Sequence, residues 1–224
     1  TGINQTAGRL ALRAAGNLAV NARLGLPNES AVPPDSGWSL QLAAGADTAS
    51  ADTLAVNAST AQGDVTLGSQ GKVTTSTGDI QIVAGRDFSA ASPASVVYTT
   101  GRALTLPILS ATGLKWAAPA TGVNFVDGGS IAIHAGRDVN GSGSYADVND
   151  WLRRTTGTPG ATLTSPLTSA RGFAYLPAYW WVDRLGNTAA KTRGIEGIAT
   201  LGGGNIAIAA GNTVSNVSVA SATS

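Results

Sequence analysis

Cysteine and methionine are absent from the 224-residue sequence, and charged side chains make up only 12% of it. The absence of cysteine excludes disulfide bridges and thiolate metal sites, so stability has to come from hydrogen bonding and packing. Fourteen basic and thirteen acidic residues leave a formal net charge of +1. A chain without a basic excess has no electrostatic footprint for nucleic acid or for an anionic membrane. We therefore expect neither as a partner.

Long apolar runs are missing as well. No stretch of the sequence approaches the roughly 18 apolar residues of a transmembrane helix, so we expect no insertion of this segment into a membrane. The sequence begins at Thr1 and shows no basic leader followed by an apolar segment, as a signal peptide would. We expect it to be a segment of a longer protein.

What the sequence does contain is a recurring motif of a glycine, two branched or leucine residues spaced by one, small residues and a second glycine. The chain has 29 glycines, and 43% of its residues are hydrophobic. The copies are GRLALRAAGNLAV from Gly8, GWSLQLAAGAD from Gly37, GDIQIVAGRDF from Gly78, GSIAIHAGRDV from Gly129 and GNIAIAAGNTV from Gly204, with a shorter relative, GDVTLGSQGKVTT, from Gly63.

Apolar residues alternate with others within each copy, as Ile80 and Ile82 do, and this alternation is typical of a half-buried strand. These isoleucines should point inward and Gln81 outward. Gly85 then supplies a bend, and Phe88 begins a second short strand. Glycine, serine, threonine and asparagine recur too often for a helix. Each copy is therefore predicted to be a strand, a corner and a strand.

Such short strands cannot bury one apolar face alone, so repeats of this kind become stable only when they stack. Copies stacked about 4.8 Å apart would bond to equivalent strands above and below, and their inward side chains would form columns along the axis. The predicted fold is all-β, a right-handed parallel β-helix or solenoid, with its hand taken from the rule for parallel crossovers.

The copies are unevenly spaced along the chain. A coil of roughly 20 to 29 residues cannot absorb the distance from Gly78 to Gly129, or that from Gly129 to Gly204. Parts of the chain must therefore project from the stack. We predict a single β-helix segment over residues 1–224, with projecting insertions at about 90–127 and 141–201 and a smaller one around Pro27 to Ser36.

The copies GDIQIVAGRDF, GSIAIHAGRDV and GNIAIAAGNTV resemble the repeats of filamentous haemagglutinin family exoproteins, the secreted partners of two-partner secretion systems. The stretch SPASVVYTTGRA, from Ser92 to Ala103, is similar to a region toward the C-terminal part of very large members. The resemblance extends over most of the chain. It implies a right-handed β-helix shaft, secreted or held on the surface of a Gram-negative bacterium, and exported unfolded through an outer-membrane transporter.

Members of this family act in adhesion, biofilm formation or delivery of a C-terminal toxin, and the resemblance does not choose among these functions. The family's N-terminal secretion domain, with its asparagine-proline motif, does not occur in this sequence, so a domain outside this chain would contact the transporter. We expect a structural shaft or adhesin segment, with a host-cell glycan or surface protein as its partner. A passive stalk for a C-terminal toxin is an alternative.

His134 is the only histidine, so a histidine-based triad or metal site would have to be built on it. Alternation places it on the outward side of its strand, and no second histidine or cysteine can join it. Several β-helix enzymes cleave acidic polysaccharides with clustered carboxylates. Asp147 and Asp150 stand near Arg153 and Arg154, but within an insertion. We expect no enzymatic activity, no cofactor and no metal, with polysaccharide binding or cleavage as the alternative.

The tripeptide Gly-Arg-Asp occurs twice, from Gly85 to Asp87 and from Gly136 to Asp138. Its order differs from the Arg-Gly-Asp that integrins recognise. We expect it to form a corner salt bridge or an Asx-type turn.

Aromatic residues gather in the second insertion, which holds seven of the twelve in the chain. Rings on a projecting loop can stack on sugars or anchor a protein partner. A long insertion also needs a small core of its own, and we favour that interpretation for these rings. The candidate ligand-binding residues are Tyr175, Tyr179, Trp180, Trp181, Trp151 and Arg171.

Overall fold

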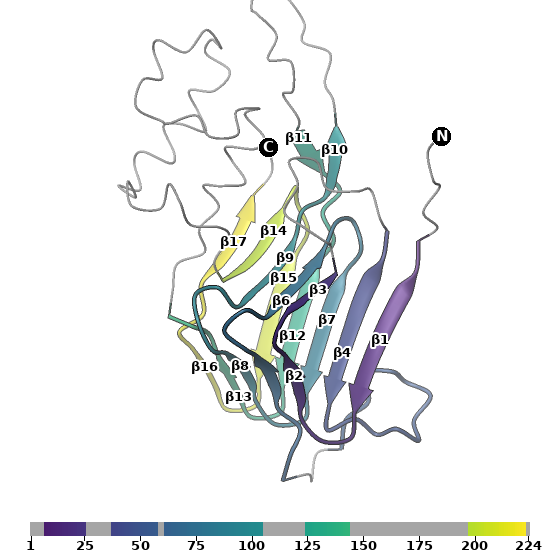
Figure 1. Ribbon diagram of the computed structural model, residues 1–224, viewed down its shortest axis with the longest axis vertical. Helices are drawn as coiled ribbons and strands as arrows, with labels where there is room; N and C mark the ends of the chain where they lie inside the picture. The colour runs from purple at the N-terminus through teal and green to yellow at the C-terminus, as the bar shows by residue number, and fades with distance from the viewer. Residues whose placement is uncertain (1–6, 26–36, 58–60, 105–123, 144–196, 223–224) are drawn as a thin grey trace, which may run out of the picture.

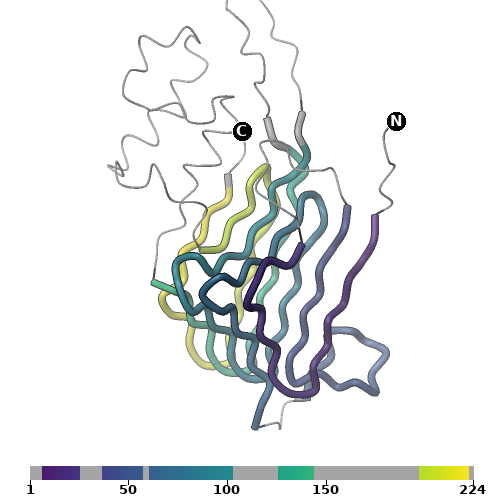
Figure 2. Tube along the Cα trace, in the orientation of Figure 1, coloured from purple at the N-terminus to yellow at the C-terminus, as the bar shows by residue number. Residues whose placement is uncertain are grey.

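The computed structural model describes residues 7–25, 37–57, 61–104, 124–143 and 197–222. Over these ranges the chain winds repeatedly around one axis, and each turn, here called a coil, adds one strand to each of three parallel sheets (Figures 1 and 2). The prediction of an all-β solenoid is confirmed, because the described residues form a three-sided parallel β-helix with five strands in each side. None of them forms a helix that is long and apolar enough to cross a membrane.

The three sheets carry strands of different length. The first sheet consists of β1 (Arg9–Ala14), β4 (Ser39–Ala44), β7 (Ile80–Ala84), β12 (Ile131–Ala135) and β15 (Ile206–Ala210). The second consists of β2 (Leu18–Val20), β5 (Val65–Leu67), β8 (Phe88–Ala90), β13 (Asp138–Asn140) and β16 (Thr213–Ser215). The third consists of β3 (Arg23–Gly25), β6 (Lys72–Thr75), β9 (Val96–Thr99), β14 (Ile198–Leu201) and β17 (Val219–Ala222). A separate hairpin pairs β10 (Arg102–Leu104) with β11 (Asn124–Val126).

Equivalent residues stay in line from coil to coil because the pairings between coils are parallel and in register. Ile131 pairs with Ile80 of the preceding coil and with Ile206 of the following one. Ile131 and Ile133 are buried, whereas Ala132 between them is exposed. The predicted interior columns of isoleucine and leucine are therefore confirmed.

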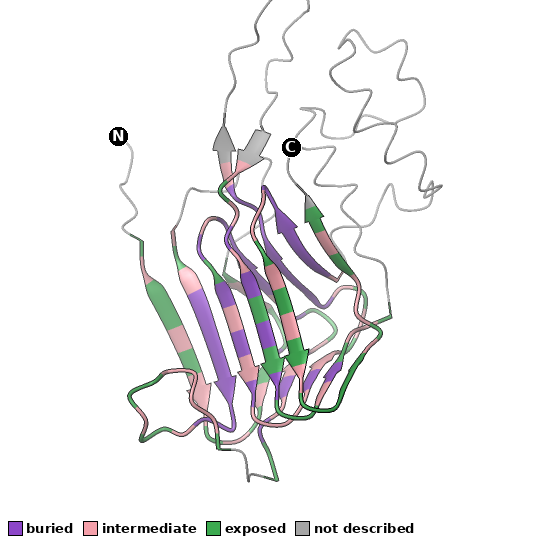
Figure 3. Ribbon diagram, turned by 180° about the vertical axis from the view of Figure 1, so that it is seen from behind, coloured by how far each residue is buried: buried purple, intermediate pink, exposed green. Residues whose placement is uncertain are grey.

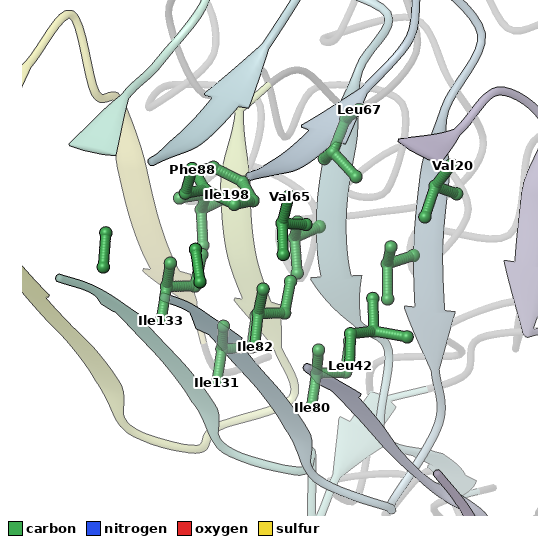
Figure 4. Close-up of a cluster of buried hydrophobic side chains, with 14 of the residues drawn as sticks. Val20, Leu42, Val65, Leu67, Ile80, Ile82, Phe88, Ile131, Ile133 and Ile198 are labelled. Atoms are coloured by element: carbon green, nitrogen blue, oxygen red, sulfur yellow. The ribbon is translucent and has the colours of Figure 1, made fainter. Parts of the chain in front are cut away.

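Side chains from all three sheets fill the interior in one apolar cluster. Ile82 and Ile133 of the first sheet belong to it together with Val65 and Phe88 of the second and Ile198 of the third (Figure 4). Ile82 is fully inaccessible and Phe88 is 1% exposed. Complete burial of one such side chain contributes roughly 1.5–3 kcal/mol, so stacking of the coils supplies the main stabilisation.

Two copies of the motif lie in the same coil, whereas the sequence predicts a strand, a corner and a strand for each copy. The copy from Gly37 supplies β4, but a loop follows its corner in place of a second strand. The copy from Gly63 supplies β5 and β6, which lie in the second and third sheets. Val65 accordingly pairs with Phe88 and not with Ile80. The shorter copy completes the coil that its predecessor begins.

The loop of residues 46–57 contacts the outer surface of β4. Thr53 Oγ1 donates a hydrogen bond to Gln41 Oε1 at 2.7 Å, and Gln41 Nε2 donates to Gln81 Oε1 of the next coil at 2.6 Å. Gln41 is only 7% exposed, and Ala43 is fully inaccessible. As a result β4 is buried on both faces (Figure 3), unlike the later strands of the same sheet.

Each coil contains a third strand, which the motif does not predict. Strands β9 and β14 pair with each other in the third sheet, although they fall within the ranges 90–127 and 141–201 that were expected to project. Both strands are buried along their whole length, so their sequences show no alternation of apolar and polar residues. The boundaries of the insertions are corrected accordingly: the first leaves the third sheet after β9, and the second rejoins it at Gly197. The smaller insertion around Pro27 to Ser36 lies outside the described residues.

Buried threonines occupy equivalent positions at or next to the end of three strands in the third sheet. Thr75 pairs with Thr99, and Thr99 pairs with Thr200. Each hydroxyl donates to the carbonyl of the glycine that begins the next coil, which satisfies an acceptor at a corner where strand pairing ends. The three bonds are Thr75 to Gly78 at 2.5 Å, Thr99 to Gly129 at 2.7 Å and Thr200 to Gly204 at 3.1 Å.

Candidate functional site

The residues predicted to bind a ligand lie outside the described part of the chain. Trp151, Arg171, Tyr175, Tyr179, Trp180 and Trp181 all fall within residues 144–196, as do Asp147 and Asp150, which were considered for polysaccharide cleavage. What the structure defines is the place on the shaft where this segment departs and returns.

The departing end of the second insertion is bonded to the following coil. Gly141 N–H donates to Ser215 O at 2.9 Å, and Gly143 N–H donates to Asn216 O at 3.0 Å. A Cβ atom on Gly141 would lie 2.0 Å from Asn216 O, so the close approach of the two backbones requires glycine here. The insertion therefore leaves the corner between the second and third sheets from a position that the neighbouring coil holds.

The returning end of the same insertion is bonded to the preceding coil. Val97 N–H donates to Gly197 O at 3.1 Å. A small hollow with a mainly apolar lining lies beside both ends, next to Phe88, Ile198 and Val217. Strand pairing with the coils on either side thus sets the distance between the two ends.

The first insertion begins as an antiparallel hairpin that projects from the stack between β9 and β12 (Figure 1). Arg102 Nε donates to Asp127 Oδ2 at 2.6 Å in an ion pair near the base of the hairpin. Gly101 N–H donates to Ser76 O of the preceding coil at 3.0 Å. The two insertions therefore leave from different corners, each tied to a neighbouring coil.

Carboxylates form a ladder along the corner between the first and second sheets. Asp64 Oδ1 accepts from Arg86 Nε at 2.6 Å and from the backbone N–H of Asp87 at 3.2 Å. Asp87 Oδ1 repeats this one coil further, accepting from Arg137 Nε at 2.8 Å and from the N–H of Asp138 at 3.2 Å. Each carboxylate therefore binds the coil that follows its own.

Uncharged donors and acceptors continue this corner ladder toward both ends of the stack. Asn17 Oδ1 accepts from the N–H of Asp64 at 3.0 Å. Asp138 Oδ1 accepts from Asn212 Nδ2 at 2.8 Å and from the N–H of Thr213 at 3.1 Å. The predicted corner salt bridge is confirmed, and the structure adds that its hydrogen-bonded partners come from successive coils.

The corner ladder changes the pKa values of its members. The hydrogen bond from Arg86 lowers the pKa of Asp64, and that from Arg137 lowers the pKa of Asp87, while burial acts in the opposite direction in both cases. The same bonds raise the pKa of each arginine. The ion pairs are thus fully formed at neutral pH, and their perturbed pKa values belong to coil-to-coil bonding, as structural networks also perturb pKa values.

Two of the side chains that accept hydrogen bonds in the corner ladder were not identified from the sequence. Asn17 and Asp64 each directly precede the first apolar residue of a second strand, as Asp87 and Asp138 do. That shared position was the available signal. The Gly-Arg-Asp motif did not reveal this position, because neither Asn17 nor Asp64 follows an arginine.

The outer surface of the first sheet carries His134, whose predicted outward position is confirmed. It is exposed, and it stands in register with Val83 and Ala209 of the neighbouring coils. In the part of the chain that the structure describes, no group of three or more histidine, aspartate or glutamate side chains is arranged to hold a metal ion.

Comparisons with protein-family models, with curated proteins and with solved structures found no match to this chain. The likeness to filamentous haemagglutinin repeats remains a resemblance of sequence motifs.

Proposed function

We propose that this chain is a shaft segment of a large secreted bacterial surface protein, in which the β-helix holds projecting insertions at fixed positions for adhesion. The observation that carries the proposal is the pairing of β12 with β15. These strands pair in register from Ile131 with Ile206 to Ala135 with Ala210, although residues 144–196 lie between them in the chain. The stack thus accommodates a long insertion without any shift in register.

A physical reason supports the role of scaffold. In a solenoid each coil contacts only its neighbours, so an insertion at a corner leaves the pairing on either side intact. Loops that project from a rigid scaffold are where binding residues are usually found. The bonds at Gly141, Gly143 and Gly197 hold the second insertion at such a corner.

The partner we propose is a host-cell glycan or surface protein, bound by the aromatic residues of the second insertion. Secretion to a Gram-negative cell surface through an outer-membrane transporter belongs to the same proposal and is supported by the motif resemblance. The near-neutral charge of the chain is compatible with contacts made through aromatic rings and hydrogen bonds.

Binding of the full chain to glycan arrays and to host cells tests the proposal. We expect Trp180→Ala/Trp181→Ala to weaken binding at least about tenfold, because stacked aromatic anchors dominate such interfaces. Trp38→Ala is the matched control, since Trp38 is a 46% exposed tryptophan on the shaft and not in the insertion. It should bind like the parent chain.

Three other outcomes would overturn the proposal. No binding by the folded parent chain at any concentration would favour a passive stalk. Loss of binding in Trp38→Ala alone would move the binding surface to the shaft. Turnover of polyuronates that is abolished by Asp147→Asn/Asp150→Asn would make the protein a polysaccharide-cleaving enzyme.

A further inference from the structure

The outer face of the third sheet, which is directed away from the interior, is buried in its middle coils. Val97 of β9 and Ile198 of β14 belong to the interior cluster. Strand alternation therefore turns their neighbours Tyr98 and Ala199 outward. Tyr98 is nevertheless only 1% exposed, and Ala199 is fully inaccessible. Another part of the chain therefore lies over this face.

A hydrogen bond shows the outward direction of Tyr98 independently. Arg23 Nη1 donates to Tyr98 Oη at 3.3 Å. Arg23 directly precedes Leu24, which packs against the interior cluster, so Arg23 also lies on the outer face. The ring of Tyr98 thus extends along the outer face from β9 toward the first coil, and its hydroxyl has the polar partner that a buried tyrosine needs.

The other two sheets are not covered in the same coils. The outward residues of the first sheet there include Val83, which is half-buried, and Ala132 and His134, which are exposed. In the second sheet Ser89 is half-buried and Asn140 is exposed. Burial on both faces is therefore specific to the third sheet in these two coils. It also explains the continuous apolar run at the start of β9, which is typical of a parallel sheet with both faces covered.

Two segments leave the stack among the described residues, and neither lies along this face. The loop of residues 46–57 contacts the first sheet, where Thr53 donates to Gln41. The hairpin strands β10 and β11 pair with each other and make no extensive contact with a strand of the third sheet. The cover therefore comes from residues outside the described ranges.

The second insertion begins and ends at this sheet. Gly143 lies at the corner that leads into the third sheet, and Gly197 directly precedes β14. The outer face also changes from charged to apolar toward this strand. Lys72 of β6 is half-buried and pairs with Val96 of β9, which is 1% exposed. The covered, apolar part of the face is thus the part nearest to the insertion.

The composition of the second insertion suits an apolar face. Residues 144–196 hold seven of the twelve aromatic residues of the chain, whereas residues 105–123 hold one and residues 26–36 hold none. Large rings gain most from burial against apolar surface. The second insertion therefore has the side chains that this face requires.

We propose that the second insertion, residues 144–196, packs aromatic side chains on the outer face of β9 and β14. Val96, Tyr98 and Ala199 form the receiving surface on the shaft. The insertion is then held along the third sheet as well as at its two ends. Rings that are not used in this contact are thereby oriented for a partner.

Single cysteines measure whether the face is covered. The chain has no native cysteine, so Ala199→Cys places one thiol on the face, and Ala132→Cys places one on the exposed outer side of the first sheet. The rate of reaction with the thiol reagent DTNB reports access to each. In the full chain we expect the Ala199→Cys thiol to react at least about 100-fold more slowly than the Ala132→Cys thiol.

Two deletions identify the segment that covers the face. The first replaces residues 144–196 by one glycine, which leaves five residues between β13 and β14, as many as residues 91–95 between β8 and β9. The second replaces residues 105–123 by Asn-Gly, a turn that suits the hairpin of β10 and β11. Circular dichroism verifies that each variant keeps its β structure.

We expect the first deletion to raise the reaction rate of Ala199→Cys to within about fivefold of that of Ala132→Cys. The second deletion should leave the thiol protected. The proposal is overturned by a thiol that reacts freely in the full chain, by one that stays protected without residues 144–196, or by one that becomes equally reactive without residues 105–123.

Photocross-linking in the full chain covers the case in which a deletion variant fails to fold. Benzoylphenylalanine in place of Tyr98 keeps an aromatic ring on the face and, on irradiation, bonds to a neighbouring C–H group. Mass spectrometry should find its cross-links within residues 144–196, and none there from benzoylphenylalanine in place of His134. Absence of cross-links from position 98 to residues 144–196 overturns the proposal. Both measurements are made without a ligand, so they test this contact separately from adhesion.

Discussion

Asp87 shows how one side chain joins two coils of this protein. Its carboxylate accepts hydrogen bonds from the side chain of Arg137 and from the backbone of Asp138, both in the following coil. Strand pairing ends at the corner, so the backbone donor there would otherwise depend on water. Because Asp64 does the same one coil earlier, the corner ladder links coils where the sheets cannot.

Acid should weaken the fold through the corner ladder. A carboxyl group whose pKa is lower in the folded chain contributes stability above its unfolded pKa, about 3.9 for aspartate, and loses that contribution as the pH falls through the folded pKa. The folded pKa values of Asp64 and Asp87 are lowered. We expect the urea midpoint of unfolding to fall between about pH 5 and pH 3, and to fall less in Asp64→Asn/Asp87→Asn.

The matched control for this titration is Asp47→Asn/Asp52→Asn. These carboxylates accept bonds from the backbone of their own loop, at Ala49 and Leu54. The control removes the same number of charges without touching a contact between coils. An equal reduction of the pH dependence in both double variants would contradict the role of the ladder.

Removal of the buried hydroxyl of Thr99 should lower the free energy of unfolding by a measurable amount. Thr99 is fully inaccessible, and its Oγ1 donates to Gly129 O. Thr99→Val keeps the shape of the side chain but removes the donor, so we expect a loss of about 1–2 kcal/mol in the free energy of unfolding. Thr66→Val, on the half-exposed outer side of β5, should change it by less than about 0.5 kcal/mol. Equal losses of stability in the two variants would show that the hydrogen bond from Thr99 to Gly129 does not stabilise the fold.

At the scale of elements, very short strands are held by tight corners. The strands of the second sheet have three residues each, so they depend on a corner that brings successive backbones close together. Gly136 N–H donates to Ala84 O at 2.9 Å, and a Cβ atom on Gly136 would lie 2.3 Å from Gly85 O. A Cβ atom on Gly211 would likewise lie 2.2 Å from Gly136 O, so the close spacing between coils requires glycine at both positions.

Gly136→Ala should destabilise the protein by about 1–3 kcal/mol, because the atom that the new methyl group meets is backbone and cannot turn aside. Gly16→Ala, at the same corner of the first coil, would meet only the side-chain oxygen of Gln62 at 2.9 Å. That side chain can rotate, so we expect a change of less than about 0.5 kcal/mol. Urea unfolding followed by circular dichroism measures both, and a Gly136→Ala variant as stable as the parent would refute the packing argument.

At the scale of the whole molecule, the fold is a one-dimensional stack. Each coil contacts only its neighbours, so the inner coils are stabilised on two sides and the end coils on one. The burial of residues follows this order, since β4 and β7 are largely buried while β1 and β16 are largely half-buried or exposed. The protein should therefore open from its ends.

Hydrogen exchange should show this order directly. At a concentration at which the chain is monomeric, we expect amides of β7 and β12 to exchange slowest, and those of β1, β16 and β17 to exchange faster by at least about tenfold. Mass spectrometry of peptides from each strand measures the rates. Uniform protection across all coils would mean that the stack opens only as a whole.

The sequence by itself determined the first sheet. Strand β12 buries one face only, so Ile131 and Ile133 alternate with exposed Ala132, and the alternation is readable without knowledge of the neighbours. The corner ion pairs were predictable for the same local reason, because Asp87 and Asp138 directly follow a glycine and an arginine at the end of a strand. The assignment of a ligand to Trp180 and Trp181 stays a prediction.

Only the tertiary structure decided the third sheet and the composition of the coils. Thr99 is buried because the strands of neighbouring coils and the corner glycine surround it, and its local sequence, VVYT, has no alternation of apolar and polar residues that would mark an inward face. The same holds for the copy from Gly63, which reads as a separate repeat until its strands pair in the second and third sheets. Apolar and polar residues alternate only in a strand that has one face exposed to water. A strand that is buried on both faces has no such alternation, so only its pairing with the strands of neighbouring coils identifies it.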